Sequence, residues 1–334
     1  MNLSPVRQRI SVYGPGVLLS AVLAIAAQFL SDHYGAPAML LALLLGIAFG
    51  FLAEEGRCVP GIDLSGQTIL RIGVALLGAR ISVDLVVGLG WEPIALVIAG
   101  VFATILFGLA GARMLGRGWR LALLTGGAVA ICGASAAMAI ASILPKNENS
   151  QRNLTFTVLG VTVLSTLAMI AYPIAADLLD LSEAGTGVFF GGTIHDVAQV
   201  VGAGFSVSET AGETATVVKL IRVTMLAPVI LIFGLCLAGF GVERQAGERP
   251  PLVPGFILMF FALAAVNSFD LIPAAARDLL ADVSRWALLT AIAAVGMKTS
   301  LRKIAEVGGT AIVLICAETL FLAAFICIGV RALM

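Results

Sequence analysis

Long charge-poor segments alternate with short polar connections along the whole chain. Residues 93–112, 154–176 and 223–242 are examples, because none of them contains a charged side chain. An α-helix of about 20 residues crosses the roughly 30 Å hydrocarbon core of a bilayer. The pattern therefore predicts an all-α polytopic membrane protein.

Glycine, proline and charged clusters divide the chain into successive hydrophobic elements. They lie near residues 14–30, 37–53, 67–79, 93–112, 121–144, 154–176, 187–206, 214–240, 252–269, 286–298 and 307–330. The elements at 67–79 and 286–298 are too short to span alone, so we expect them to extend into their polar flanks. About 9–11 transmembrane helices are predicted in this way. The polar connections are too short to fold independently, which predicts one membrane domain over residues 1–334.

Composition supports the membrane assignment and removes several other classes of protein. Mean hydropathy is +1.05 and only 12% of residues are charged, against roughly a quarter in soluble domains. Zero net charge without a basic cluster argues against nucleic-acid binding. The 5 cysteines lack CxxC spacing and the 2 histidines are too few for a metal centre, so we expect no cofactor. No GxxxxGK[ST] motif for ATP is present.

The first hydrophobic element has the features of a signal peptide, with Arg7 and Arg9 before an apolar run. Because further spans follow at once, we expect a retained helix in a multi-pass protein of the cytoplasmic membrane. A cytoplasmic N-terminus would place Arg113, Arg117 and Arg120 on the inside, in agreement with the positive-inside rule.

One region fits that orientation badly if every element spans. Lys146 and Arg152 would lie outside, and the acidic connection at 177–183 would lie inside. If the glycine-broken elements 121–144 and 187–206 each enter and leave on one face, both groups exchange sides. The charge bias therefore favours two re-entrant elements.

Internal similarities point to inverted repeats. The segment 78–82 (GARIS) matches 296–300 (GMKTS), and Pro37 and Pro254 each precede an apolar element at nearly the same offset. Likewise Thr125-Gly126-Gly127 opens one broken element and Phe190-Gly191-Gly192 the other. Interrupted helices meeting near the midplane are typical of secondary transporters. Chance similarity among glycine-rich helices is the alternative.

The glycine pairs Gly126-Gly127 and Gly191-Gly192 weaken the helices that contain them. Exposed backbone at membrane depth requires cover from protein or a water-filled cavity, so the pairs predict an internal polar chamber. A half-helix that begins there would direct free N–H groups at an anion. Close helix packing is the alternative role of these glycines.

Thr193, His195 and Asp196 follow the second glycine pair directly. Ionisable groups are costly in lipid and mark functional sites by default. We expect Thr193 and His195 to contact the substrate, and Asp196 to carry a proton or orient a neighbour. The alternative for Asp196 is a structural hydrogen bond to a backbone N–H in the helix break.

Lys219 and Arg222 lie three residues apart on one face of the next helix. They are expected to offset the charge of an anion in the chamber. Because both lie close to an end of the expected element, snorkelling to the headgroups is the alternative.

Glu318 lies near the centre of the last element, where snorkelling cannot reach water. Proton coupling is one expected role of this carboxyl group. A static pair with a cation such as Arg71 is the other.

Four segments carry a resemblance over nearly the whole chain: GGTIHDVAQVVGAG, LTGGAVAICGASA, LLGARIS and AVGMKTSL. They resemble the sulfate exporter family of bacterial inner-membrane proteins, the YeiH-like proteins. The resemblance implies a cytoplasmic-membrane transporter of about ten helices that exports sulfate or a related sulfur oxyanion. It also implies an association of some members with sulfonate breakdown, and it supplies no site map.

The sequence therefore predicts a non-enzymatic secondary transporter with a small inorganic or organic anion as its partner, driven by a proton or sodium gradient. Its surroundings are the lipid bilayer, nucleic acid is not expected, and a homo-oligomer is left open. A proton- or sodium-coupled carrier of carboxylates or sulfonates is the main alternative. An intramembrane hydrolase using Cys132 and His195 is a remote one, because no oxyanion hole is recognisable.

Overall fold

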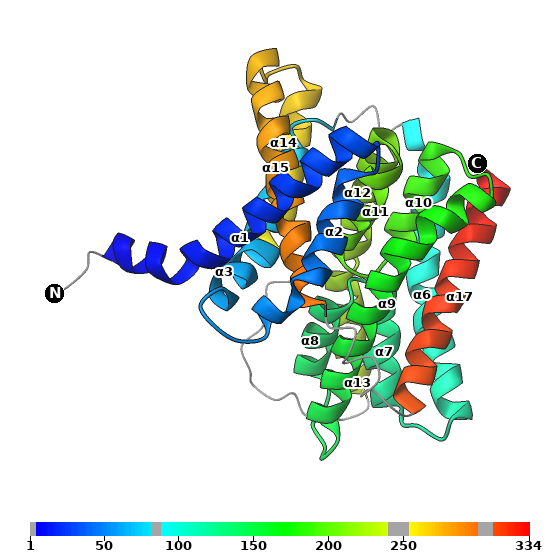
Figure 1. Cartoon of the computed structure of the whole chain (residues 1–334). Helices are drawn as coiled ribbons and strands as arrows, with labels where there is room; N and C mark the ends of the chain where they lie inside the picture. Colours follow the sequence, from blue (N-terminus) through cyan, green and yellow to red (C-terminus); the bar gives the residue numbers. More distant parts are fainter. Residues whose placement is uncertain (1–4, 82–87, 240–253, 300–309) are drawn as a thin grey trace. The chain divides into compact units, whose positions relative to one another are not determined.

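The computed structural model describes residues 5–81, 88–239, 254–299 and 310–334 (Figure 1). Throughout these ranges the regular structure is helical, and 6 helices are long and apolar enough to cross a membrane. Four further apolar helices are shorter, between 10 and 17 residues. The predicted all-α polytopic fold is confirmed.

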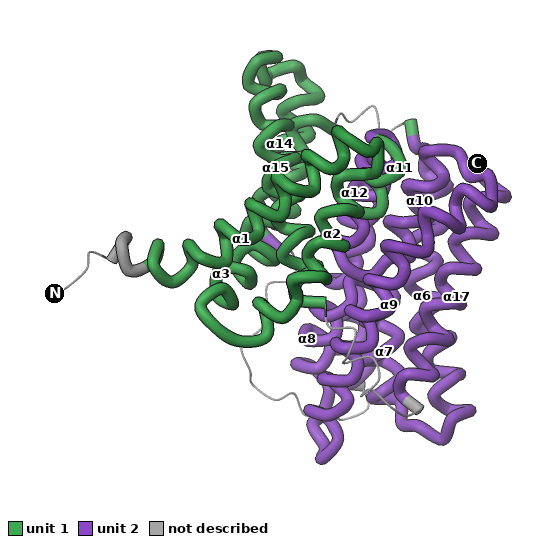
Figure 2. Tube along the Cα trace, in the orientation of Figure 1, with its two compact units in different colours: residues 1–88, 201–208, 255–300 green, residues 89–200, 209–254, 301–334 purple. Residues whose placement is uncertain are grey.

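The chain forms two compact units (Figure 2). Unit 1 contains residues 1–88, 201–208 and 255–300, and unit 2 contains residues 89–200, 209–254 and 301–334. Each unit is described by itself below. All predicted site residues fall in unit 2.

Among the described residues, unit 1 contains eight complete helical segments and the end of a ninth, α11 (Val197–Val207). The complete segments are α1 (Pro5–Tyr34), α2 (Ala38–Ala48), η1 (Gly50–Ala53), α3 (Val59–Leu64), η2 (Ser65–Ile69), α4 (Leu70–Leu77), α14 (Gly255–Ser268) and α15 (Ala274–Lys298). The two short elements of the sequence do extend into their polar flanks. Helices α3 and α4 join through the π-helical turn η2 into one run, and α15 reaches 25 residues.

A two-fold relationship inside unit 1 appears in the contacts of two glycines. A Cβ on Gly78 would meet the carbonyl oxygen of Phe260, and a Cβ on Gly296 would meet that of Leu43. Phe260 lies six residues after Pro254, and Leu43 lies six residues after Pro37. Each matched block therefore contacts the helix that the other block's proline begins. Ser82 and Ser300, the last residues of the matched blocks, lie outside the described residues.

Unit 2 contains long helices and pairs of short ones. They are α6 (Trp91–Met114), α7 (Trp119–Ala130), α8 (Ala134–Ile143), α9 (Ser150–Leu178), α10 (Glu183–Thr193), α12 (Glu209–Thr224), α13 (Leu226–Gly239) and α17 (Thr310–Leu333). Helix α11 (Val197–Val207) begins in unit 2 and ends in unit 1. Twice, two short helices precede one long apolar run, as the sequence predicts.

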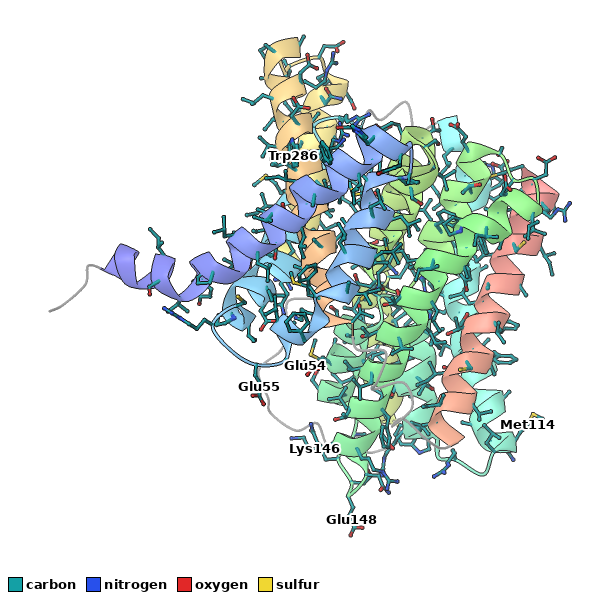
Figure 3. All side chains as sticks on the ribbon, in the orientation of Figure 1. Glu54, Glu55, Met114, Lys146, Glu148 and Trp286 are labelled. Carbon is teal, nitrogen blue, oxygen red and sulfur yellow. The ribbon has the colours of Figure 1, made fainter. Side chains whose placement is uncertain are left out.

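Helices α7 and α8 form a re-entrant pair. A Cβ placed on Gly127 would lie 3.6 Å from Cγ1 of Ile140, whereas a continuous helix would separate these residues by about 20 Å. The chain therefore turns back after α7. In Figure 3, Met114 before this pair and Lys146 and Glu148 after it lie at the same end of unit 2.

Helices α10 and α11 re-enter in the same way from the other end. Gly187 of α10 packs against Ala211 and Thr214, and Gly191 packs against Ala215 and Val218 of α12. The two helices thus run parallel and start at the same level. Since α10 runs away from that level, α11 has to bring the chain back to it before α12 begins.

Re-entrance settles the charge distribution that continuous spans could not explain. Lys146 and Arg152 lie at the end of unit 2 where α6 finishes, the end that carries Arg113. Asp177 and Asp180 lie at the opposite end, where α9 finishes. The positive-inside rule assigns the end with Lys146 and Arg152 to the cytoplasm.

Candidate functional site

The two helix breaks lie at residues 131–133 and 194–196. In the first, Gly133 has a φ of 63°, a left-handed conformation that strains any residue with a side chain. In the second, Ile194 leaves the helix in an extended conformation, with φ −63° and ψ 136°. The first break is therefore fixed by one glycine, whereas the second uses backbone angles open to most residues.

The breaks meet each other at mid-depth. A Cβ on Gly133 would lie 3.3 Å from Cβ of His195 and 3.4 Å from Cγ2 of Val161. Val161 lies close to the middle of α9, and the Ser165 hydroxyl accepts a hydrogen bond from the backbone N–H of Asp196 at 3.0 Å. Because α9 is long enough to span the bilayer, the crossing lies near the midplane, as predicted.

Lys219 joins the ends of both first half-helices. Its Nζ donates to the carbonyl oxygens of Ile131 and Ile194, each at 2.9 Å. Ile131 and Ile194 are the C-cap residues of α7 and α10. One ammonium group therefore satisfies equivalent orphan carbonyls of the two broken helices.

Arg222 repeats this arrangement one turn further along α12. Its Nε donates to Ala130 at 2.5 Å, its Nη1 to Ile194 at 3.1 Å and more weakly to Gly191 at 3.5 Å, and its Nη2 to Val129. The planar guanidinium group can donate hydrogen bonds to two backbone segments at once. The two cations thus fasten α7 and α10 together through the main chain.

Lys219 and Arg222 are both 0% exposed. Snorkelling to the headgroups, the alternative open from the sequence, is therefore wrong. In the described part of the chain, the hydrogen-bond partners of the two cations are all backbone carbonyl oxygens. Each helix C-terminus is equivalent to about half a negative charge. The two ends balance about one of the two positive charges.

His195 and Asp196 serve different partners, as expected for neighbours in sequence. Nε2 of the buried His195 ring lies 3.0 Å from Oγ1 of Thr319, in a hydrogen bond whose direction depends on the tautomer. The Oδ1 atom of Asp196 accepts from the backbone N–H of Ala198 at 2.8 Å. Asp196 thus makes the structural hydrogen bond that was its alternative role, at the N-terminus of α11.

Glu318 is 0% exposed and contacts the first broken helix. Its Oε1 accepts from the hydroxyl of Thr125 at 2.9 Å, while Oε2 has no hydrogen-bond partner within the described residues. Its neighbour Thr319 contacts His195, so consecutive residues of α17 contact both broken elements. No ion pair of Glu318 is found in the part of the chain that the structure describes.

The glycine pairs have a different local geometry from the predicted one. They precede the C-terminal ends of α7 and α10, so the breaks expose carbonyls near them instead of free N–H groups. Gly126 approaches Cα of Ile105, and Gly192 approaches Ile326. Gly127 and Gly191, described above, also contact neighbouring helices closely. The expectation of N–H groups at these glycines is wrong, and close helix packing accounts for all four.

Thr193 does not direct its hydroxyl away from its own helix. The side chain is buried, and Oγ1 donates to the carbonyl of Phe189 one turn earlier at 2.5 Å. Free N–H groups of the kind expected at the glycines occur instead at α8, whose N-cap Gly133 makes no side-chain hydrogen bond.

Several polar neighbours of the site escaped the sequence analysis. Thr125, Ser165 and Thr319 contact the site residues, and Nε2 of Gln199 donates to the Thr166 hydroxyl at 2.7 Å. Hydroxyl groups in apolar helices usually bond their own backbone. Their spacing alone therefore does not reveal which of them cross to another helix.

The fold and this site define a multi-pass helical protein of the cytoplasmic membrane, in which two re-entrant helix pairs meet around buried cations. The profile of a family described as "Conserved hypothetical protein 698" matches residues 15–315. The chain belongs to this family, the UPF0324 membrane proteins.

Three relatives illustrate how similar the sequences of other family members are to this chain. A UPF0324 membrane protein of Rhizobium meliloti is 68% identical over 321 residues, covering 96% of this chain and 93% of the relative. UPF0324 membrane protein TauZ of Paracoccus denitrificans is 61% identical over 334 residues, covering 99% of each. A UPF0324 membrane protein of Chlorobaculum tepidum is 53% identical, covering 95% of this chain and 89% of the relative.

Proposed function

We propose that this protein is a secondary transporter that exports a small anion, sulfate or a related sulfur oxyanion, across the cytoplasmic membrane. The observation that carries the proposal is the buried pair Lys219 and Arg222 at the crossing of two re-entrant helices. Interrupted helices that meet at the midplane around a charged site are a recurring arrangement in secondary transporters.

The charge balance of the crossing favours an anion. Two buried cations face two helix C-termini, each worth about half a negative charge, which leaves about one positive charge uncompensated. The N-terminus of α8 adds about half a positive charge, while the carboxylate of Asp196 caps α11. A positive excess in a low-dielectric interior attracts anions strongly.

Access to the cations requires movement, because carbonyl oxygens occupy their donors. We expect a shift of α7 or α10 to release some of these bonds, so that an oxyanion takes the place of the carbonyls. Arginine binds tetrahedral oxyanions and carboxylates through two parallel N–H bonds. Ser135 of α8 is exposed and Asp196 is half-buried, so both breaks reach the surface of the described chain near this crossing.

The proposed roles of the remaining predicted residues follow from their positions. His195 lies beside the first break, with its Cβ close to Gly133, and is the proposed ligand of the anion. Glu318 is the proposed coupling residue because it touches the moving helix α7 through Thr125. Asp196 remains a second candidate for coupling. Thr193, Gly126, Gly127, Gly191 and Gly192 are proposed to shape the crossing by close packing.

A proton- or sodium-coupled carrier of carboxylates or sulfonates is the second candidate, because the same cations accept those anions. The intramembrane hydrolase is disfavoured, since Nε2 of His195 pairs with Thr319 instead of the Cys132 thiol. The name TauZ belongs to the Paracoccus relatives. Family membership supports the choice of a sulfur oxyanion only through the resemblance noted in the sequence.

Counterflow in proteoliposomes tests the proposal. Vesicles loaded with unlabelled sulfate are diluted into labelled sulfate, and competition by sulfite, taurine and small dicarboxylates is measured. We expect labelled sulfate to accumulate transiently and sulfite to compete. Protein-free vesicles and vesicles carrying His195→Ala are the controls. Exchange of dicarboxylates without sulfate would favour the second candidate, and exchange of no anion would reject both.

A further inference from the structure

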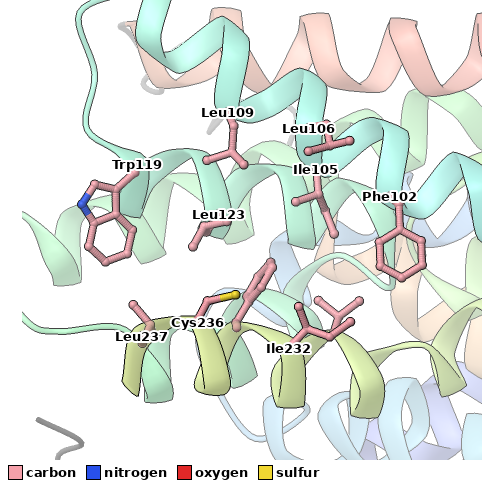
Figure 4. Close-up of a pocket in the computed structure, with 11 residues that line it drawn as sticks. Phe102, Ile105, Leu106, Leu109, Trp119, Leu123, Ile232, Cys236 and Leu237 are labelled. Atoms are coloured by element: carbon pink, nitrogen blue, oxygen red, sulfur yellow. The ribbon is translucent and has the colours of Figure 1, made fainter. Parts of the chain in front are cut away.

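An apolar groove of about 770 Å³ lies on unit 2 (Figure 4). Phe102, Leu106 and Leu109 of α6 line one wall, Leu123 of α7 lies at its back, and Ile232 and Leu237 of α13 form the other wall. Figure 4 shows Trp119 and Leu237 at one end of the groove and Phe102 at the other. Helix α6 and the run of α12 and α13 are long and apolar enough to cross the bilayer, and Leu106 and Ile232 on the two walls are exposed, so we place the groove toward lipid.

The dimensions of the groove match one leaflet. The lining residues of α13 run from Val229 to Leu237, which is about 12 Å along a helix axis. Half of the hydrocarbon core is about 15 Å thick. Phe102 lies near the middle of α6, so the groove ends close to the midplane. A transmembrane helix from a second copy would need a groove about twice as long.

Positive charge gathers at the Trp119 end. Arg113 occupies the last turn of α6, and Arg120 follows Trp119 in α7. The guanidinium carbon of Arg120 lies 5.4 Å from the centre of the Trp119 ring. The Nε atom of Arg120 is buried and has no hydrogen-bond partner among the described residues. Tryptophan and arginine in this position are typical of the membrane–water interface.

We propose that this groove binds an anionic phospholipid of the cytoplasmic leaflet. One acyl chain lies along the groove between α6 and α13, and the phosphate accepts hydrogen bonds from Arg113 and Arg120. The positive-inside rule places these arginines at the cytoplasmic surface, where basic pockets between helices bind anionic headgroups. The occupant is a lipid and not the transported anion, so this site is independent of the proposed transport function.

Quenching of tryptophan fluorescence by brominated lipids tests this proposal. The chain has 3 tryptophans, so Trp91→Phe with Trp286→Phe leaves Trp119 alone beside the groove. The variant is reconstituted in vesicles containing either brominated phosphatidylglycerol or brominated phosphatidylcholine at equal mole fraction. We expect phosphatidylglycerol to quench Trp119 at lower mole fractions, by about fivefold for each arginine that holds the headgroup.

A matched control keeps Trp91 in place of Trp119. Trp91 lies at the other end of the same helix α6 and has acidic Glu92 as its neighbour. Its quenching should not depend on the headgroup. Arg113→Gln leaves the ring contacts of Trp119 unchanged and should remove about half of the preference on a logarithmic scale.

Two results would overturn the proposal. Equal quenching of Trp119 by both lipids would show that the groove takes any acyl chain without recognising its headgroup. Quenching of Trp119 by neither lipid would show that another occupant, such as a second copy of this chain, covers the groove. Because the first comparison varies only the lipid, it does not depend on whether the arginine variants fold.

Discussion

The two helix breaks of unit 2 have the same architecture but different chemistry. In the first, the turn is made by Gly133 in a left-handed conformation, and this glycine is also the N-cap residue of α8, so the N-cap position has no side chain. In the second, His195 and Asp196 occupy the turn, and Asp196 both caps α11 and bonds to Ser165 of α9. The first break therefore depends mainly on the backbone conformation of a glycine, whereas the second also places a histidine and an aspartate in the turn.

This difference indicates how two repeats can divide the work of one site. Carbonyl oxygens at the helix C-termini of both breaks accept hydrogen bonds from Lys219 and Arg222. Both breaks therefore help to hold the two cations in place. His195 of the second break is the side chain that we propose as the ligand of the anion, whereas the first break has Cys132 at the corresponding position. We therefore expect structural substitutions to affect both breaks together, and functional substitutions to act mainly through the second.

The largest effect is expected from Arg222→Met, which removes one of the two cations that link the breaks and leaves Lys219 as the other. The carbonyl oxygens of Val129, Ala130 and Gly191 lose the donor that Arg222 provides, while Ile194 keeps its bond from Lys219. Each buried unsatisfied group costs about 1–3 kcal/mol. Relief from burying the guanidinium offsets part of this cost. We still expect a loss of about 4 kcal/mol, comparable with the whole stability of many domains.

The measurement is the thermal unfolding midpoint of the purified protein in detergent. Arg222→Lys keeps the charge but reaches fewer carbonyls, so an intermediate loss is expected. Arg152→Ala, at an exposed position at the start of α9, is the matched control and should leave the midpoint unchanged. A normal midpoint for Arg222→Met would mean that the cation does not hold the breaks together.

The next effect compares the breaks directly through His195→Ala and Cys132→Ala. Alanine at 195 keeps the Cβ that lies against Gly133 but removes the ring that bonds Thr319. We expect transport to fall to background while membrane insertion stays normal. Cys132, the corresponding buried residue of the first break, should tolerate alanine with transport retained.

Initial rates of counterflow, normalised to the amount of folded protein, measure both variants. Full transport by His195→Ala would remove the central site assignment. Loss of transport in both variants at normal stability would show that the two breaks contribute chemistry equally, against the division of labour proposed above.

A smaller and more selective effect is expected from Glu318→Gln. The amide oxygen of glutamine can still accept from Thr125, so helix α7 should remain in place. The side chain can no longer gain or lose a proton. We expect the dependence of transport rate on pH to flatten while the apparent affinity for the anion changes little. An unchanged pH profile would leave Glu318 with a structural role.

The sequence predicted the positions of the breaks more securely than their geometry. The charge distribution around Lys146 and Arg152 favours re-entrance, and the structure confirms it. This feature is predictable because the charge bias depends only on the side of the membrane on which each connection lies. The pairing of Pro37 with Pro254 likewise identified a real symmetry. These features are properties of whole segments, which composition and spacing report well.

The orientation of groups inside the crossing was less predictable. The glycine pairs were expected to begin half-helices, whereas the chain breaks a few residues later, at Gly133 in the first pair. Lys219 and Arg222 allowed either snorkelling or burial, because local spacing does not say which helix lies opposite. The partners of Glu318 and His195 are threonines 193 and 124 residues away in sequence, respectively. Tertiary packing decides such contacts.

The smallest functional effect, and a direct test of the shared architecture, is expected from single cysteines at positions 148 and 180. Glu148→Cys and Asp180→Cys are introduced into a chain that keeps only the buried Cys132. The other native cysteines are replaced because they are not buried: Cys58, Cys236, Cys316 and Cys327. Re-entrance of both breaks places residue 148 on the cytoplasmic side and residue 180 on the external side. A membrane-impermeant maleimide applied to intact cells should therefore label position 180 and spare position 148 until the membrane is permeabilised.

Both variants should transport normally, because both positions lie at ends of α9, far from the crossing. Labelling of position 148 from outside, with position 180 protected, would mean that α7–α8 and α10–α11 each cross the membrane instead of re-entering. The two repeats would then not be equivalent in the way proposed here.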